Sequence, residues 1–138
     1  MGVMLAIEPG ASGSTSLIVG DEHTAARVGS GKIGVLATPV LINLFEAAAL
    51  AACESLLPEG HQSLGTRLDI SHTAATPVGM TVNATARVTA VEGRTVRFAL
   101  EARDDVEVIG AGTHERVVVS VDRFDVRVQD KRKRAGMA

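Results

Sequence analysis

Two side chains in this 138-residue chain stand where acid–base or nucleophilic chemistry could occur. His72 lies in SHTAATP, between two hydroxyl residues and just ahead of a Thr-Pro turn. Glu46 is the only carboxylate between Gly34 and Cys53, within an otherwise apolar run. An imidazole transfers protons near neutral pH, and a carboxylate in apolar surroundings can serve as a base or a nucleophile. The two residues therefore raise the question of whether the fold brings them to one site.

Each candidate also has a purely structural interpretation. His72 could pack on a half-buried strand, and Thr38, at the start of the apolar run, could cap a helix. Glu46 could reach solvent or pair with a cation such as Arg67. A buried carboxylate without a partner is costly, so a Glu46 inside the protein requires one. The residue types alone leave the structural and the chemical interpretations open.

The apolar run that holds Glu46 predicts a long helix over residues 37–60. Thr38-Pro39 is a start signal, because proline is favoured in the first helical turn, and Pro58 with Gly60 is a stop signal. The helix is expected to make about five turns and is apolar nearly all round. Such a helix is typically enclosed by other elements, and a sheet is the expected enclosure.

Strand-like segments rich in Val and Thr follow the helix, with period-two alternation in TVNATARV and TVRFALEA. Glu92-Gly93 and Asp104-Asp105 supply turns between them. The predicted strands are residues 63–71, 81–91, 95–103 and 106–121, with an earlier strand or pair at 14–19 and 23–28. One buried helix and a meander of antiparallel strands indicate an α+β domain in which a curved sheet wraps the helix, the outline of a hotdog fold.

Composition restricts the function and the compartment. Residues 1–138 are expected to form a single domain with a basic tail from about 131. A net charge of −2 and 2% aromatic residues argue against a nucleic-acid partner. A lone cysteine, Cys53, predicts a cytoplasmic location, and the lack of a long apolar span or a signal sequence predicts no membrane partner. GSGKIG (residues 29–34) lacks the spacing of a phosphate-binding loop.

The remaining polar motifs carry weaker signals. His23 and His61 fall in predicted loops without acid or cysteine partners at ligand spacing, so no metal site and no cofactor are expected. His114 and Arg116 are two residues apart and therefore share one face of a predicted strand. They could belong to a salt-bridge ladder on the surface or to a functional site. KRKR (residues 131–134) has the composition of a solvated tail, with the phosphates of coenzyme A as an alternative partner.

Four stretches resemble a known family: TPVLINLFEAAALAACESLLPEG, SLGTRLDISHTAATPVGMTV, VEGR and IGAGTHERVVV. They are similar to hotdog-fold thioesterases of the fluoroacetyl-CoA thioesterase type, from about residue 38 to 131, whereas the N-terminal third matches poorly. The resemblance implies an acyl-CoA substrate and an active site built from Thr38, Glu46 and His72. It also implies that an amide near Gly65 and the guanidinium of Arg116 hold the thioester and neighbouring groups.

Thioester hydrolysis is chemically consistent with these residues. Glu46 could attack the carbonyl or deprotonate a water, and His72 could donate a proton or hydrogen bond to the developing charge or the leaving thiolate. A second hypothesis is a non-catalytic acyl-CoA-binding protein in which Glu46 and His72 satisfy each other. A third, weaker one is a dehydratase or another acyl-thioester enzyme on the same fold.

Helix geometry adds a constraint. Eight residues separate Thr38 from Glu46, about 12 Å along a straight helix, so direct contact between them is not expected. Either the chain folds back before Pro39 or a second subunit supplies a group, and the sequence predicts a homodimer. The segment VGSGKIGVLATP (residues 28–39) holds no aromatic residue. A tight aromatic lid over a fluorinated acyl group is therefore not expected, nor is strong selection of fluoroacetyl-CoA over acetyl-CoA.

Overall fold

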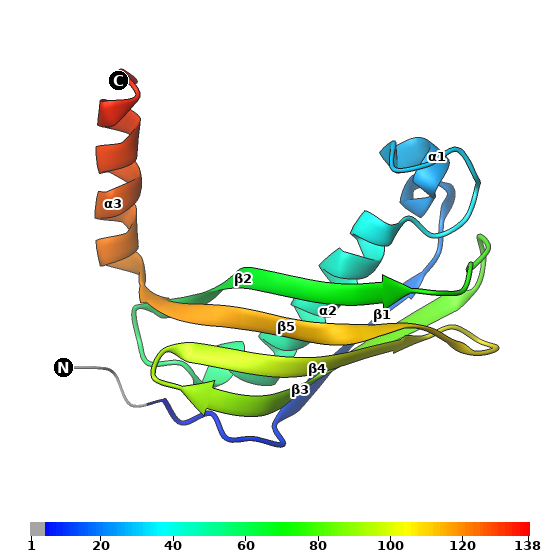
Figure 1. The fold of residues 1–138 in the computed structure, drawn as a ribbon, viewed down its shortest axis with the longest axis horizontal. Coiled ribbons are helices and arrows are strands. Elements are labelled where there is room, and N and C mark those ends of the chain that lie inside the picture. Colours follow the sequence, from blue (N-terminus) through cyan, green and yellow to red (C-terminus); the bar gives the residue numbers. More distant parts are fainter. Residues whose placement is uncertain (1–4) are drawn as a thin grey trace.

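A computed structural model describes residues 5–138 (Figure 1). A single sheet curves around one long helix, and shorter helices extend from the two ends of the sheet. The elements in chain order are β1 (Ser12–Ile18), the 3-10 turn η1 (Asp21–His23), α1 (Ala25–Val28), α2 (Thr38–Cys53), the 3-10 turn η2 (Glu54–Leu56), β2 (His61–His72), β3 (Thr81–Glu92), β4 (Thr95–Arg103), β5 (Val108–Ser120) and α3 (Val121–Arg134).

The five strands form one antiparallel sheet in the order β1-β3-β4-β5-β2. β2 and β1 are therefore the edge strands, and the outer side of β2 has no neighbouring strand within the described chain. β2 pairs with β5 from His61 opposite Ser120 to His72 opposite Gly110, with a bulge between Gly65 and Arg67. Because a bulge redirects side chains, the register changes in the middle of this edge.

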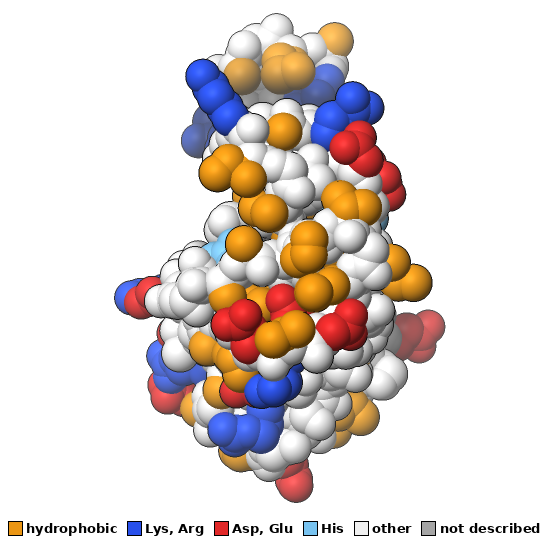
Figure 2. Space-filling model, turned by 90° about the vertical axis from the view of Figure 1, so that its right-hand side faces the viewer, with side chains coloured by type: hydrophobic (Ala, Val, Ile, Leu, Met, Phe, Trp, Pro, Cys, Tyr) orange, Lys and Arg blue, Asp and Glu red, His pale blue; other side chains and the backbone are white. Residues whose placement is uncertain are grey.

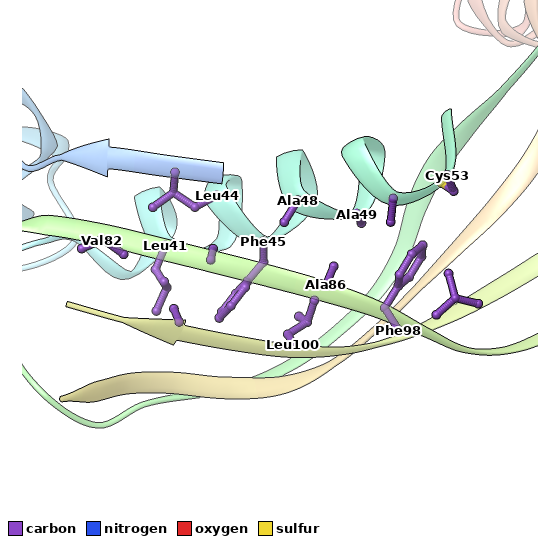
Figure 3. Packing of buried hydrophobic residues seen from close by; sticks show 14 of the residues in the cluster. Leu41, Leu44, Phe45, Ala48, Ala49, Cys53, Val82, Ala86, Phe98 and Leu100 are labelled. Atoms are coloured by element: carbon purple, nitrogen blue, oxygen red, sulfur yellow. The ribbon is translucent and has the colours of Figure 1, made fainter. Parts of the chain in front are cut away.

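Helix α2 begins one residue after the predicted start and carries Pro39 in its first turn, where the missing amide hydrogen costs no bond. It ends at Cys53, earlier than predicted, and η2 completes the segment before Pro58. One face of the helix is buried and packs on the sheet (Figure 3). Its buried residues are Leu41, Leu44, Phe45, Ala48, Ala49, Ala52 and Cys53.

The sheet meets α2 with alternate residues of its central strands, as period-two patterning predicts (Figure 3). Small side chains allow a close approach: a β-carbon added to Gly13 of β1 would lie 2.5 Å from the Ala48 carbonyl oxygen. Burial of this apolar surface is the main source of stability for the fold. The inward residues of β3 and β4 are Val82, Ala84, Ala86, Val88, Val96, Phe98, Leu100 and Ala102.

The prediction of a strand at residues 23–28 is wrong. Residues 25–28 form the short helix α1, which follows η1 and ends at Gly29, whose φ of 94° favours glycine. The alanine pair at its start favours helix over strand. Backbone bonds from Ala25 to Val35 and from Leu36 to Thr76 tie the segment after α1 to the rest of the fold.

The C-terminal segment also differs from the prediction. The strand predicted at 106–121 is β5, and residues 121–134, including the expected basic tail, form helix α3. The Ser120 hydroxyl accepts a bond from the amide of Arg123, and an ion pair links Arg134 to Asp130 one turn earlier. Basic residues in the last turn complement the helix dipole, which explains why this polar segment is helical.

Residues Thr38–Leu56 are long and apolar enough, by length and composition, to cross a membrane. In this fold the segment is the central helix, and its buried face packs against β1 and β3. Its hydrophobicity is thus explained by the core.

Candidate active site

The first cluster forms where the start of α2 meets the end of β2. The Thr38 hydroxyl lies 2.7 Å from His72 Nδ1. Thr38 is the first residue of α2, and the N-cap position belongs to Ala37, so the capping interpretation of Thr38 is wrong. No side chain caps the first turn of α2. The Thr38 hydroxyl is therefore not used as a cap and can bond to the imidazole of His72.

His72 presents its other ring nitrogen without a partner. Nε2 is buried and makes no hydrogen bond within the described residues. Burial lowers the pKa of His72, and the nearby backbone of Ala74 partly offsets this effect. If the Thr38 hydroxyl donates to Nδ1, the neutral ring carries its proton on Nε2. A buried N–H without a partner is suited to donate to a ligand oxygen or sulfur.

A cavity of about 350 Å³ adjoins this pair. Its walls come from α1, from the segment between α1 and α2, and from the residues that follow β2. The volume lies within the range of small-ligand pockets. The lining residues are Ala25, Ser30, Gly31, Lys32, Ile33, Val35, Leu36, Thr38, His72, Thr73, Ala74 and Ala75.

The second cluster surrounds Glu46 near the middle of α2. Its carboxylate accepts a bond of 3.2 Å from Arg116 Nη1 on β5, and this pair joins a buried guanidinium to a side chain that is 36% exposed. The Glu46 Oε2 atom also lies against Gly65 on β2, where an added β-carbon would approach it to 2.6 Å. Arg116, not Arg67, is therefore the partner of Glu46, and the glycine leaves space for the carboxylate.

Arg116 is itself fixed by neutral groups. Its Nε donates to the Ser63 hydroxyl at 2.8 Å, its Nη2 donates to the Ser63 carbonyl at 3.1 Å, and its Nη1 lies 3.2 Å from His114 Nε2. The Ser63 hydroxyl in turn donates to Glu54 at 2.8 Å. A guanidinium group that is held by three contacts has a single orientation. Arg116 therefore places its positive charge next to Glu46 in a fixed position.

His114 supports this arrangement from a buried position. Its Nδ1 lies 2.8 Å from the Arg67 carbonyl, and its ring stacks on Phe98 with centroids 5.7 Å apart. Nδ1 must donate to the carbonyl, which leaves Nε2 as an acceptor for Arg116. Burial lowers the pKa of His114, the bond to Arg67 opposes this, and the Arg116 charge adds to the lowering. The ring is thus held neutral.

His114 and Arg116 share one strand face as predicted, but the idea of a surface ladder is wrong because both side chains are buried. The two side chains lie on the face of β5 that is turned toward α2, where Arg116 bonds to Glu46. Ser63, Glu54 and the supporting role of His114 were not predicted from the sequence. The signal available for Ser63 was its place two residues before Gly65, on the same strand face.

The described chain brings its candidates together in two groups and not in one. Thr38 joins His72, and Glu46 joins Gly65 and Arg116, with no hydrogen bond between the groups in residues 5–138. The predicted separation of about 12 Å along α2 applies, since this stretch is a regular helix. The hypothesis in which Glu46 and His72 satisfy each other is therefore not supported by the contacts.

No group of three or more His, Cys, Asp or Glu side chains within residues 5–138 has the arrangement needed for a metal ion. His23 and His61 lie in different elements: the first belongs to η1 and accepts a bond from the Gly20 amide, and the second begins β2.

The curved antiparallel sheet around a central helix is the hotdog architecture of the thioesterase superfamily, as solved structures confirm. Residues 19–122 match the family described as fluoroacetyl-CoA-specific thioesterase, FlK. The match spans most of the chain, and the chain belongs to this family of thioester hydrolases.

Individual relatives agree with this assignment. The fluoroacetyl-CoA thioesterase of Streptantibioticus cattleyicolor is 43% identical over 97 residues, 70% of each chain. A solved structure of fluoroacetyl-CoA thioesterase FlK superposes with a TM-score of 0.84 at 34% identity, covering 91% of this chain and 98% of the other. A thioesterase superfamily protein of Thermus thermophilus gives a TM-score of 0.90 at 25% identity, covering 96% of this chain and 98% of the other.

Proposed function

We propose that the protein hydrolyses acyl-CoA thioesters to a free acid and coenzyme A, with Thr38, Glu46 and His72 in catalytic roles. The observation that carries the proposal is the buried, unpartnered Nε2 of His72, oriented by Thr38 beside a cavity of small-ligand size. Relatives of the family support the substrate class, because one FlK variant was solved with fluoroacetate and CoA.

The proposed site is completed by a second copy of the chain. Thr38 and Glu46 of one chain are separated by about 12 Å along α2, and His72 and Gly65 by about 23 Å along β2. One thioester cannot contact both clusters at these separations. The outer side of β2 has no partner strand in the described chain. An antiparallel pairing of two β2 edges would bring the Gly65 part of one strand toward the His72 end of the other.

In this arrangement the thioester carbonyl lies between the two clusters. The Glu46 carboxylate attacks the carbonyl carbon, expelling CoA thiolate and forming an anhydride that water then cleaves, or it takes a proton from the attacking water. The His72 N–H donates to the oxygen or sulfur that gains charge. The Gly65 amide is assigned to binding of the thioester, and Arg116 is assigned to Glu46. The geometry favours Arg116 as the positioning residue for Glu46, because its donors point at protein groups.

A thiol-release assay over a panel of acyl-CoAs tests the function directly. The parent protein is expected to release free CoA from at least one thioester, while a binding protein or a dehydratase would release none. Hydrolysis in labelled water under single-turnover conditions tests the nucleophilic role of Glu46. Label in the Glu46 carboxylate indicates an anhydride that water cleaves at the Glu46 carbonyl, whereas label only in the product acid is the result both for a general base and for an anhydride cleaved at its acyl carbonyl.

Mixing two inactive variants tests the shared site. Glu46→Gln and His72→Ala each disable one cluster. If the site is shared between subunits, a mixed dimer restores one intact site, and an equal mixture recovers about a quarter of the parent activity. If each site lies within one chain, the mixture remains inactive. Light scattering must also show a dimer at micromolar concentration, since a monomer would contradict the proposal. The cytoplasmic location stays a prediction, consistent with the free, buried thiol of Cys53.

A further inference from the structure

The cavity beside His72 contains one feature that the proposed chemistry does not use. Of the side chains that line it, Lys32 is the only one with a full charge, and no Asp or Glu is among them. The ion pairs of residues 5–138 involve other basic residues. A cation without a carboxylate partner at a ligand pocket favours an anionic ligand group.

Lys32 is held at this wall by its backbone. Before Lys32, the Ser30 amide donates to the Ala25 carbonyl; after it, the amides of Ala26 and Ala25 donate to the carbonyls of Ile33 and Val35, and the Leu36 amide donates to the Thr76 carbonyl. These bonds tie the segment to α1 on one side and to the β2–β3 connection on the other. The lysine therefore belongs to a structured wall of the cavity.

The surface around the cavity is not generally basic. Figure 2 views the end of the molecule that carries α1, and hydrophobic side chains spread over the middle of this face. Asp and Glu side chains lie among the lower of these and at the upper right edge, and most Lys and Arg side chains lie toward the margins. A face with charges of both signs is not suited to a polyanion. The Lys32 cation is therefore matched to a single small anionic group.

We infer that Lys32 selects acyl groups with a terminal carboxylate, so that the preferred substrates are CoA thioesters of short dicarboxylic acids. The inference rests on the proposed function, in which the thioester carbonyl lies at His72. The acyl carbons then extend along the apolar side chains of Ile33 and Val35 in the cavity wall, and the distal carboxylate pairs with Lys32. An ammonium–carboxylate pair is a charge-assisted bond that a neutral acyl group cannot form.

A CoA phosphate is the other anion that could meet Lys32. The phosphates are separated from the thioester by the whole pantetheine arm. To reach a side chain in the cavity that adjoins His72, the arm would have to fold back over the reacting group. A carboxylate a few bonds from the carbonyl needs no such folding, which favours the acyl group as the source of the charge.

The test compares succinyl-CoA with butyryl-CoA, which lacks only the terminal carboxylate oxygens. The parent is expected to show a higher kcat/KM for succinyl-CoA, and Lys32→Met is expected to reduce the ratio of the two values about tenfold. Lys32→Glu should lower the ratio further, because it places like charges together. Arg94→Met, which removes an exposed cation in the β3–β4 turn at the opposite end of the sheet from His72, should leave the ratio unchanged.

The contrary results are distinct. A parent without preference for succinyl-CoA, or a Lys32→Met variant with the parent ratio, overturns the inference. The same thioesters made from 3′-dephospho-CoA identify a contact with the 3′-phosphate: if the effect of Lys32→Met disappears with them for both acyl groups, the acyl assignment is wrong.

Binding separates this inference from the proposed function. Dethia analogues of the two thioesters, with CH2 in place of sulfur, cannot be hydrolysed, and calorimetry gives their Kd values. A Lys32-dependent preference for the succinyl analogue supports the inference even if the parent hydrolyses no thioester. Equal Kd values for the two analogues overturn it even if hydrolysis is observed.

Discussion

The two clusters on α2 are built in opposite ways. Thr38 and His72 make one hydrogen bond to each other and open onto a cavity. Glu46, by contrast, meets a buried arginine whose other donors are occupied by Ser63 and His114. The first cluster keeps a free donor for a ligand, and the second holds a carboxylate in one orientation. The difference agrees with the proposed roles, in which a Glu46 carboxylate held in one orientation is the nucleophile or base and the His72 donor meets the atom that gains charge.

The largest effect is expected from Glu46→Gln. The amide keeps the shape of the side chain but cannot attack a carbonyl or accept a proton, so kcat/KM should fall at least about 100-fold. Thermal unfolding should show a folded protein. A folded variant with a near-parent rate would remove Glu46 from the mechanism and make its cluster purely structural.

Thr38→Val should have the next largest effect. It removes the hydroxyl that orients His72 while keeping the volume, and kcat should fall about 30-fold, within the range for general acid–base groups. Thr38→Ser keeps the hydroxyl and should retain most of the rate. Equal losses in the two variants would show that the Thr38 methyl group, and not its hydrogen bond, matters.

Gly65→Ala should act through the position of the carboxylate. The added β-carbon would lie 2.6 Å from Glu46 Oε2 and 3.1 Å from His114 Cε1, so the flexible carboxylate must move. We expect kcat to fall about tenfold with little change in Tm, because a small misplacement of a reacting group is costly. Gly34→Ala is the matched control, since nothing lies within 4 Å of its added β-carbon. Equal rates in the two variants would contradict the proposed role of Gly65.

A smaller effect is expected on the pH dependence of stability. Each cluster contains a histidine, and burial lowers the pKa of both histidines. The unfolded chain binds protons near the ordinary histidine pKa of about 6.5, while folded His72 and His114 stay neutral at that pH. The stability they contribute is present above that pKa and is lost as the pH falls toward the lower folded values. Tm should therefore drop as the pH is lowered from 7 to 5. His114→Gln should reduce this dependence, and an unchanged dependence would argue against a neutral His114.

The smallest difference is expected between acetyl-CoA and fluoroacetyl-CoA. The segment at residues 28–39 has no aromatic side chain, and the cavity wall it forms contains Lys32, Ile33 and Val35. Comparable kcat/KM values for the two thioesters are expected, because a single fluorine substituent adds little binding free energy in an open pocket. A strong preference for the fluorinated thioester, measured side by side, would contradict this.

The sequence predicted what depends on local pattern. The apolar run around Glu46 and the alternation in TVNATARV identified α2 and the central strands, because burial on one side imposes these periods. Segment 121–134 was missed because Phe124, Val126 and Val128 alternate like a strand, while its helix depends on a cap and an ion pair. Partners such as Ser63 and Arg116 depend on the register of β2 with β5, which single-sequence patterns do not define.

Helix α3 has a consequence for cooperativity. None of its residues, all of which the structure describes, is buried, so it contributes no side chain to the core. Its 14 residues are held by a serine cap, end charges and one local ion pair, which support an isolated helix of this length only marginally in water. Its backbone amides should therefore exchange with solvent deuterium long before those of α2, whose opening requires loss of the whole core. The chain thus combines a cooperative unit with a terminal helix that melts independently.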